Sequence, residues 1–277
     1  MVSVEVATMP IFSAKGKWVL AVALAAGIGA AGAFAGPEPA QGGEQLAAAG
    51  LAQPSASADQ LFADLVRHNE LRNAQLHDYS AVRTYAVGDL KGKIHAKTTV
   101  RMTYVAPDKK EFVAISEEGS SVVRHLVLNR LMESEVATAA GQDHRDSSIT
   151  PANYTFELLG QEDLGVHHCF VVAATPKRRD TYLFEGKVWI DSTDFAVVQI
   201  AGHPAKKLSF WITRADFVRQ YEKVGDFWLP AKDQTFVDVK LYGKKILSIE
   251  HHIDSVNGAR NAAVAEPSTV YSAGGTK

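Results

Sequence analysis

Cysteine is almost absent from this sequence, since Cys169 is the only one among 277 residues. A single cysteine excludes an internal disulfide, so an apolar core has to hold the fold, and a chain of this length can bury a sufficient one. Cys169 lies in the apolar run His168–Val172. A buried structural thiol is favoured there over a reactive nucleophile.

An excess of charge of either sign is also missing. The 29 basic and 31 acidic residues give a formal net charge of −2. Proteins that bind nucleic acid concentrate positive charge on one face, so this balance argues against a nucleic-acid partner. The basic run Pro176–Arg179 is typical of a solvated turn, and contact with lipid head groups or a membrane partner is its alternative.

Motifs for catalysis and metal binding are missing as well. There is no G-x-S-x-G elbow, no glycine-rich phosphate loop and no H-x-x-x-H pair. The pairs His167–His168 and His251–His252 fall on predicted strands, where neighbouring side chains point to opposite faces and cannot bind one ion together. His144 with Asp143 and Asp146 is the best remaining metal candidate. We therefore expect no catalytic residues, no metal and no cofactor.

One hydrophobic run lies close to the N-terminus. Residues Trp18–Gly32 follow Lys15 and Lys17 and precede Ala33-Phe34-Ala35. A basic start, an apolar segment and an A-x-A site form a secretory signal peptide, with cleavage expected after Ala35. A membrane anchor is the alternative, although the run is rich in Ala and Gly and weak for a permanent span. No cysteine lies near the site, so a lipoprotein anchor is excluded.

The chain then divides by composition and periodicity. We expect a signal peptide over residues 1–35, a flexible leader over 36–56, one folded domain over 57–256 and a disordered tail over 257–277. Helical spacing occurs twice in the domain, first from Ser57 to about His77 and again from Ser121 to about Ala139.

Elsewhere in the domain the apolar residues recur with a period of two, which is typical of strands with one wet face. The most ordered stretch is Tyr182–Asp254, an antiparallel meander that contains three of the four tryptophans. No strand–helix–strand alternation occurs, so a parallel sheet is not expected. The pattern predicts an α+β fold in which about ten or eleven antiparallel strands form one strongly curved sheet, with helices on its open side.

Several features occur together: a signal peptide, an amphipathic helix, a helix after the third strand, and the motifs Tyr104-Val-Ala-Pro107, Gly186–Asp191 and Tyr221–Pro230. Over about residues 57–256 they resemble the outer-membrane lipoprotein-sorting (LolA-like) superfamily. The resemblance implies an unclosed half-barrel around an apolar cavity, lidded by helices on the concave side. Such cavities take up acyl chains of lipoproteins or other lipids, and some relatives are stress sensors instead.

One position departs from that pattern. The carrier family has an Arg immediately before the Pro of the early strand, where it fastens the lid, and this sequence has Ala106. Arg83 or Arg101 could take that role. The missing lipobox argues for a soluble periplasmic protein and against the membrane-anchored acceptor branch.

An acyl chain in water costs about 0.8 kcal/mol per exposed CH₂, so a carrier needs a large apolar concavity. The alternative for each candidate is an ordinary core position. The run from Leu208 to Lys223 predicts a strand, in which Phe210 and Trp211 point to opposite faces, so at most one of them faces a given cavity. The candidate lining residues are Val100, Met102, Phe112, Phe170, Trp189, Phe195, Phe210, Trp211 and Trp228. The candidate lid residues are Leu61, Phe62, Leu65, Leu126, Leu131 and Met132.

These observations predict a periplasmic carrier of lipoproteins or lipids in transit to the outer membrane, without enzyme activity. Its partners would be acyl chains, an inner-membrane donor and an outer-membrane acceptor protein. The alternative is a non-transporting envelope sensor or interaction module on the same fold. An envelope hydrolase or a metal-binding protein is a third hypothesis.

Overall fold

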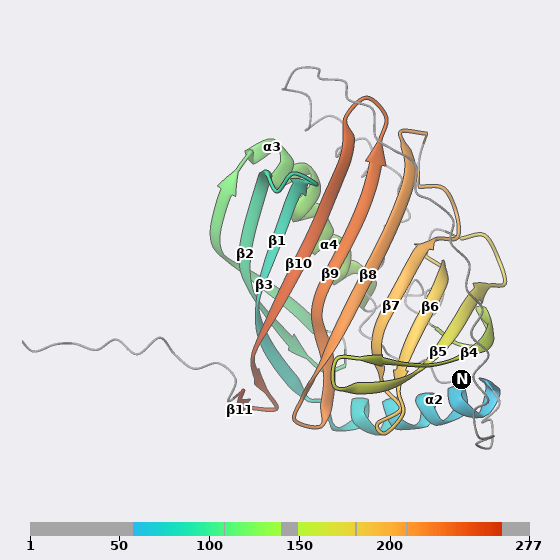
Figure 1. Cartoon of the computed structure of the whole chain (residues 1–277). Coiled ribbons are helices and arrows are strands. Elements are labelled where there is room, and N and C mark those ends of the chain that lie inside the picture. The colour runs from blue at the N-terminus through green and yellow to red at the C-terminus, as the bar shows by residue number, and fades with distance from the viewer. Residues whose placement is uncertain (1–57, 108, 140–148, 181, 209, 262–277) are drawn as a thin grey trace, which may run out of the picture.

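The computed structural model describes residues 58–107, 109–139, 149–180, 182–208 and 210–261 (Figure 1). The predicted signal peptide, the leader, most of the predicted tail and the His144 motif lie outside these residues. None of the described helices combines the length and the apolar character that a membrane crossing requires.

A single antiparallel sheet organises the domain. Its strand order is β3-β2-β1-β10-β9-β8-β7-β6-β5-β4, and β11 pairs with β10. Because β3 and β4 end this order, the curved sheet stays open, and the predicted α+β half-barrel is confirmed. The strands are β1 Asp78–Asp89, β2 Ile94–Val105, β3 Lys109–Gly119, β4 Tyr154–Leu164, β5 His167–Pro176, β6 Phe184–Asp191, β7 Val197–Pro204, β8 Ile212–Val224, β9 Phe227–Val239, β10 Gly243–Val256 and β11 Ala259–Arg260.

Two consecutive meanders build this sheet, and one long pairing joins them. Strands β1–β3 and β4–β10 each follow chain order, and β1 pairs with β10 from Tyr79↔Val256 to Asp89↔Lys245. The first and last long strands therefore lie side by side in the middle of the sheet. This pairing places residues from both ends of the domain on one shared face.

Helices cover one face of the sheet (Figure 1). Helix α2 (Ala58–Gln75) runs across the lower end of the strands, and a second helical segment lies behind β10 and β9 in the view of Figure 1. The second segment, which we call the α3–α4 helix, consists of α3 (Ser121–Val123), the π-helical η1 (Arg124–Asn129) and α4 (Arg130–Ala139). Its first turn is capped by Ser120, whose hydroxyl accepts from Val123 N at 3.4 Å.

The covered, concave face carries three apolar clusters. The first packs α2 against β4–β8, the second packs the α3–α4 helix against β1, β2 and β10, and the third lies at the lower ends of β1, β2 and β10. Alternation along each strand directs these residues to one side. The concave face therefore forms the core of the domain.

One strand boundary differs from the predicted one. Strand β8 begins at Ile212, so Phe210 and Trp211 precede it. The Asn257 side chain donates to Gln75 O at 2.7 Å and accepts from His77 N at 2.8 Å. Asn257, the first residue after β10, thus ties the end of α2 to that strand.

Candidate functional site

Helix α2 covers its half of the concave face by close packing. Leu61, Phe62 and Leu65 are buried, and the Phe62 ring stacks on Phe156 of β4. A polar contact adds to this packing, because the Arg72 guanidinium donates to the carbonyl oxygens of Asp194 at 2.8 Å and Phe195 at 3.0 Å. The three predicted lid residues on α2 are therefore core residues of a filled cluster.

The α3–α4 helix packs less completely. Val127 and Leu128 are buried, whereas Leu126, Leu131 and Met132 are only partly buried against the same cluster. The structure brings these three predicted lid residues together with two predicted lining residues, Val100 and Phe112. An apolar interior with partly accessible walls therefore lies beneath this helix.

This interior reaches the surface at the free edge of the sheet. Strand β3 is an edge strand, and Phe112 is half-buried on its concave face. Ala114, the next residue on that face, is exposed although its partner Val100 on β2 is buried. The concave face of β3 is thus less covered at Ala114 than at Phe112, next to apolar side chains of the cluster under the helix.

A buried ion pair ties the α3–α4 helix to the middle of the sheet. Arg83 of β1 and Glu135 of α4 are each 1% exposed, and Arg83 Nη1 lies 2.9 Å from Glu135 Oε2. The Tyr85 hydroxyl donates to Glu135 Oε1 at 3.0 Å. Burial opposes ionisation of Arg83, but the charge of Glu135 and the interactions with Tyr85 and Tyr79 together outweigh it and raise the pKa of the guanidinium. The Arg83 guanidinium therefore stays charged inside the protein.

The charged side chains continue as a row across four strands. Arg83 lies opposite His251 of β10, whose Nε2 is 3.0 Å from Asp233 Oδ2 of β9, and Asp233 Oδ1 is 3.4 Å from Arg219 Nε of β8. Burial, together with the charge of Arg83, lowers the pKa of His251. Burial would raise the pKa of Asp233, but the hydrogen bond from His251 and the charge of Arg219 lower it.

This row separates apolar regions of the concave face. Along β1, Arg83 lies between Ala81, which belongs to the cluster at the α2 end, and Tyr85, which belongs to the cluster under the α3–α4 helix. A polar boundary therefore crosses the interior between the two helices. The apolar cluster under the α3–α4 helix lies on one side of this row, and Phe112 packs against the clusters on both sides of it.

The other predicted lining residues lie in several places. Met102 packs in the third cluster, and Phe170, Phe195 and Trp228 are partly buried against the cluster under α2. Phe210 is 75% exposed, and Trp211 precedes β8 with it. These six residues do not share one cavity.

Trp189 lies on the opposite face of β6. It packs with Cys169, Val171 and Val198, and its indole nitrogen donates to Glu162 Oε2 at 2.9 Å. The far end of the β4–β5 hairpin supplies Glu162, and in Figure 1 this hairpin crosses in front of the sheet. The hairpin thus explains a buried tryptophan on the convex side. Cys169 is buried there as expected, and burial raises the pKa of its thiol to about 11.

Of the two arginines considered for fastening the lid, only Arg83 contacts a helix in the described structure. Arg101 is exposed on β2, and Ala106 lies at the end of that strand, where its amide donates to His77 O. Sequence reasoning named Arg83 but missed Glu135. The signal was present, because Glu135 follows Leu128, Leu131 and Met132 at helical spacing and so places a carboxylate on the apolar stripe.

Metal ligation finds no support among the residues that the structure describes, since no group of three or more His, Cys, Asp or Glu side chains is placed to hold an ion. Asp143, His144 and Asp146 lie outside these residues. The charged row on the concave face contains only one histidine and one aspartate, and both are paired within it.

No family model and no curated protein matches the chain. Among solved structures, the chain is similar to an outer membrane lipoprotein-sorting protein domain from Vibrio parahaemolyticus, with 12% identity, coverage of 75% of this chain and 95% of that chain, and a TM-score of 0.38. It is also similar to a LolA superfamily protein from Nitrosomonas europaea, with 7% identity, 71% and 92% coverage, and a TM-score of 0.34. A DUF1329 family protein from Desulfovibrio piger has 12% identity, 76% and 96% coverage, and a TM-score of 0.37.

Proposed function

We propose that the protein is an exported, non-enzymatic carrier that shields acyl chains of lipoproteins or other lipids beneath the α3–α4 helix. The observation that supports this proposal is the incomplete burial of the apolar cluster under that helix, beside the edge strand β3. Phe112, Leu126, Leu131 and Met132 are only partly buried there. The predicted signal peptide supports a periplasmic location, with a membrane donor and an outer-membrane acceptor as partners.

An acyl chain would be held by replacing water on these side chains. Transfer of each CH₂ from water contributes about 0.8 kcal/mol, so a few buried methylenes already give useful affinity. The chain would enter beside Ala114, where the concave face of β3 is exposed. No covalent step is required, because the cluster under the helix offers apolar contact and no nucleophile.

Loading and release would require the α3–α4 helix to move. Its apolar contacts are incomplete, and its buried ion pair with Arg83 favours the closed position, because separating the charges inside the protein costs several kcal/mol. The π-helical η1 is a natural place for the helix to adjust, since such segments pack and hydrogen-bond less regularly than an α-helix. Closed and open states would thus differ mainly in this helix.

The test begins with the mature protein, purified and extracted for bound lipid by mass spectrometry, and with uptake of a fluorescent acyl probe. Ala114→Trp should block the proposed entry beside β3. It should weaken probe binding about ten-fold or more, and a ten-fold change in affinity corresponds to about 1.4 kcal/mol. Val113→Trp is the matched control, because Val113 is exposed on the other face of the same strand. Its probe affinity should stay at the wild-type value.

Recovery of no lipid together with no probe uptake would overturn the carrier proposal. The non-transporting interaction module would then become the better hypothesis for this fold. Equal probe binding by Ala114→Trp and Val113→Trp would place the acyl chain elsewhere and contradict the site.

A further inference from the structure

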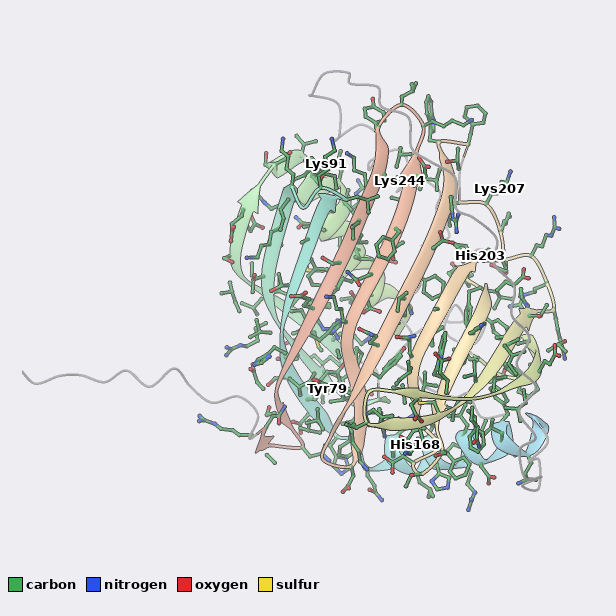
Figure 2. All side chains as sticks on the ribbon, viewed as in Figure 1. Tyr79, Lys91, His168, His203, Lys207 and Lys244 are labelled. Carbon is green, nitrogen blue, oxygen red and sulfur yellow. The ribbon has the colours of Figure 1, made fainter. Side chains whose placement is uncertain are left out.

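Three connections meet at one end of the sheet. They are the β1–β2 turn, the β9–β10 turn and the β7–β8 connection, here called the upper rim. The register places them together, because Asp89 pairs with Lys245 and Ile212 pairs with Val239. In Figure 2 the labelled Lys91, Lys244 and Lys207 lie along this upper edge, whereas Tyr79 and His168 lie toward the other end.

Large apolar side chains project from all three connections. Leu241 is 91% exposed, Phe210 is 75% exposed and Leu90 is 54% exposed. A single exposed apolar residue needs no explanation, but three on neighbouring connections at one end do. Leu241 also has φ +69°, a conformation that favours Gly or Asn, so turn geometry does not account for leucine at this tip.

Lysines surround these apolar side chains. Within the described part of the chain, none of the rim lysines takes part in an ion pair. Lys240 lies next to the rim, and its ammonium is 3.6 Å from the centroid of the Phe210 ring. The unpaired lysines of the rim are Lys91, Lys93, Lys206, Lys207, Lys244 and Lys245.

The acidic side chains of this region are fewer than its lysines, and one of them, Asp238 of β9, lies opposite Lys244. Asp89 accepts from the amides of Lys91 and Lys93 within its turn, and Asp216 pairs with Arg214. The whole chain has a net charge of −2. The rim therefore concentrates positive charge on a molecule that is slightly acidic overall.

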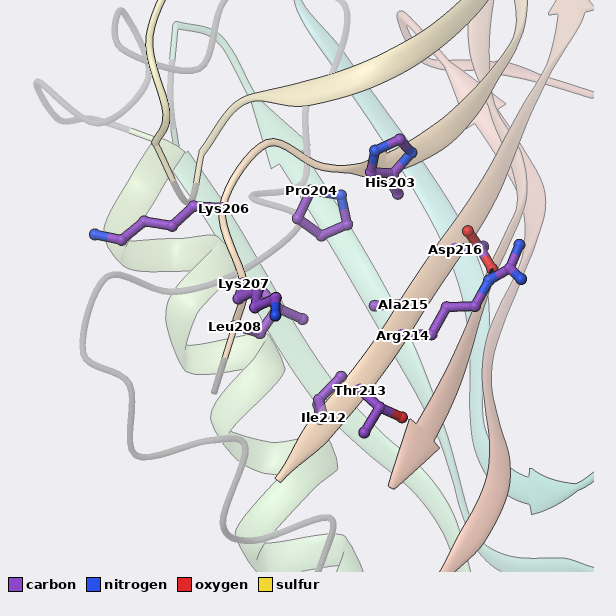
Figure 3. Close-up of a pocket in the computed structure, with 10 residues that line it drawn as sticks. All are labelled: His203, Pro204, Lys206, Lys207, Leu208, Ile212, Thr213, Arg214, Ala215 and Asp216. Carbon is purple, nitrogen blue, oxygen red and sulfur yellow. Dashed lines mark hydrogen bonds and ion pairs between the residues drawn. The ribbon is translucent and has the colours of Figure 1, made fainter. Parts of the chain in front are cut away.

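A depression of about 360 Å³ opens beside the β7–β8 connection. Its wall includes His203, Lys207 and Arg214, and Figure 3 shows Lys206 pointing away from it. Asp216 also lines the depression and pairs with Arg214, so Lys207 supplies the positive charge that a phosphate group would contact. The depression and the exposed Phe210 belong to the same connection. If the Phe210 ring entered a bilayer interface, a lipid head group would lie beside this depression.

We propose that the upper rim docks on an anionic phospholipid surface, with the lysines over the head groups and Leu241, Phe210 and Leu90 inserted at the interface. A bilayer surface has no fixed shape, so apolar side chains that lie apart from one another can insert into it while the lysines between them contact the head groups. This inference does not depend on the proposed acyl site, which lies beneath the α3–α4 helix. It would place the protein against a membrane whatever its cargo.

The experiment is sedimentation of the full mature protein with lipid vesicles. Binding should occur with vesicles of phosphatidylcholine containing about one-third phosphatidylglycerol, and it should weaken as salt rises from about 50 to about 300 mM. Leu241→Ser should weaken binding about five-fold or more, and Lys207→Glu combined with Lys244→Glu should weaken it further.

Two variants away from the rim serve as matched controls. Val166→Ser changes an apolar residue that is 89% exposed in the β4–β5 turn, and Lys187→Glu reverses an exposed lysine on β6. Both should bind vesicles like the wild-type protein.

No vesicle binding by the wild-type protein would overturn the proposal, as would rim variants that bind like the controls. Capture of an acidic protein without any vesicle binding would also overturn it, in favour of a protein partner. Acyl-probe uptake by Leu241→Ser should remain unchanged, so failure here is distinguishable from failure of the carrier proposal.

Discussion

Two helices cover the same face of one sheet, and they are held in different ways. Helix α2 is held by fully buried side chains such as Leu65. In its C-terminal half, Arg72 donates to the carbonyl oxygen of Asp194, and the carbonyl oxygen of Gln75 accepts from Asn257. The α3–α4 helix buries Val127 and Leu128 as well, but Leu126, Leu131 and Met132 are only partly buried, and a buried ion pair joins Glu135 to Arg83. The first arrangement is suited to permanent closure, and the second is suited to a cover that moves.

The two helices differ in the interactions that would be lost if each moved away from the sheet. Lifting α2 would expose a continuous apolar cluster to water with nothing to replace it. Under the α3–α4 helix, an acyl chain could replace the apolar contacts, and water could solvate the separated charges. Under the proposed function, one concave face would thus carry a fixed helix and a movable helix.

The largest effect is expected from breaking the ion pair on one side only. Glu135→Ala leaves Arg83 charged and buried without its partner, so the free energy of unfolding should fall by about 3–5 kcal/mol in urea denaturation. The double variant Arg83→Leu/Glu135→Leu removes both charges and should regain most of that loss. A double variant as unstable as the single one would contradict a pairing role.

A comparable but slightly smaller loss is expected from a cavity under α2. Leu65→Ala should cost about 2–5 kcal/mol, because a fully buried leucine loses its contacts and the filled cluster cannot collapse around the gap. The exchange rate of a bound acyl probe should not change, whereas Glu135→Ala should accelerate exchange. Faster exchange in Leu65→Ala would remove the proposed distinction between the helices.

Acid should weaken the charged row that borders the movable helix. The fold lowers the pKa of His251, so below about pH 6.5 the unfolded chain binds a proton that the folded chain does not, and stability falls with acidification by up to about 1.4 kcal/mol per pH unit. His251→Gln should flatten this dependence in denaturation curves. An unchanged slope would show that other groups dominate it.

The smallest effect is expected at the C-terminal end of α2. Asn257→Ala removes hydrogen bonds to Gln75 O and His77 N, and it should cost about 1 kcal/mol of unfolding free energy. Hydrogen exchange should become faster in the last turn of α2 and stay unchanged in the α3–α4 helix. Equal acceleration in both helices would indicate that they are coupled.

Much of the fold could be predicted because its elements carry strong periodic patterns. The alternation from Ile94 to Tyr104 and the spacing of Leu126, Leu131 and Met132 each specify one element locally. The start of β8 was misplaced because the apolar residues before Ile212 continue the pattern without a break. Trp189 was assigned to the cavity because alternation separates two faces of a strand but does not show which face is concave. The β4–β5 hairpin covers the convex face, so a tryptophan is buried there as well.

The sequence alone determined the order of strands and helices, the antiparallel class and the apolar faces, since these depend on residues close together in the chain. Only the tertiary structure decided that Arg83 meets Glu135, 52 residues away, and that His251, Asp233 and Arg219 extend the row across the sheet. Such contacts depend on strand register and on the β1–β10 pairing between the ends of the domain. A one-residue shift in register would turn each of these side chains to the other face, and no local pattern specifies that register.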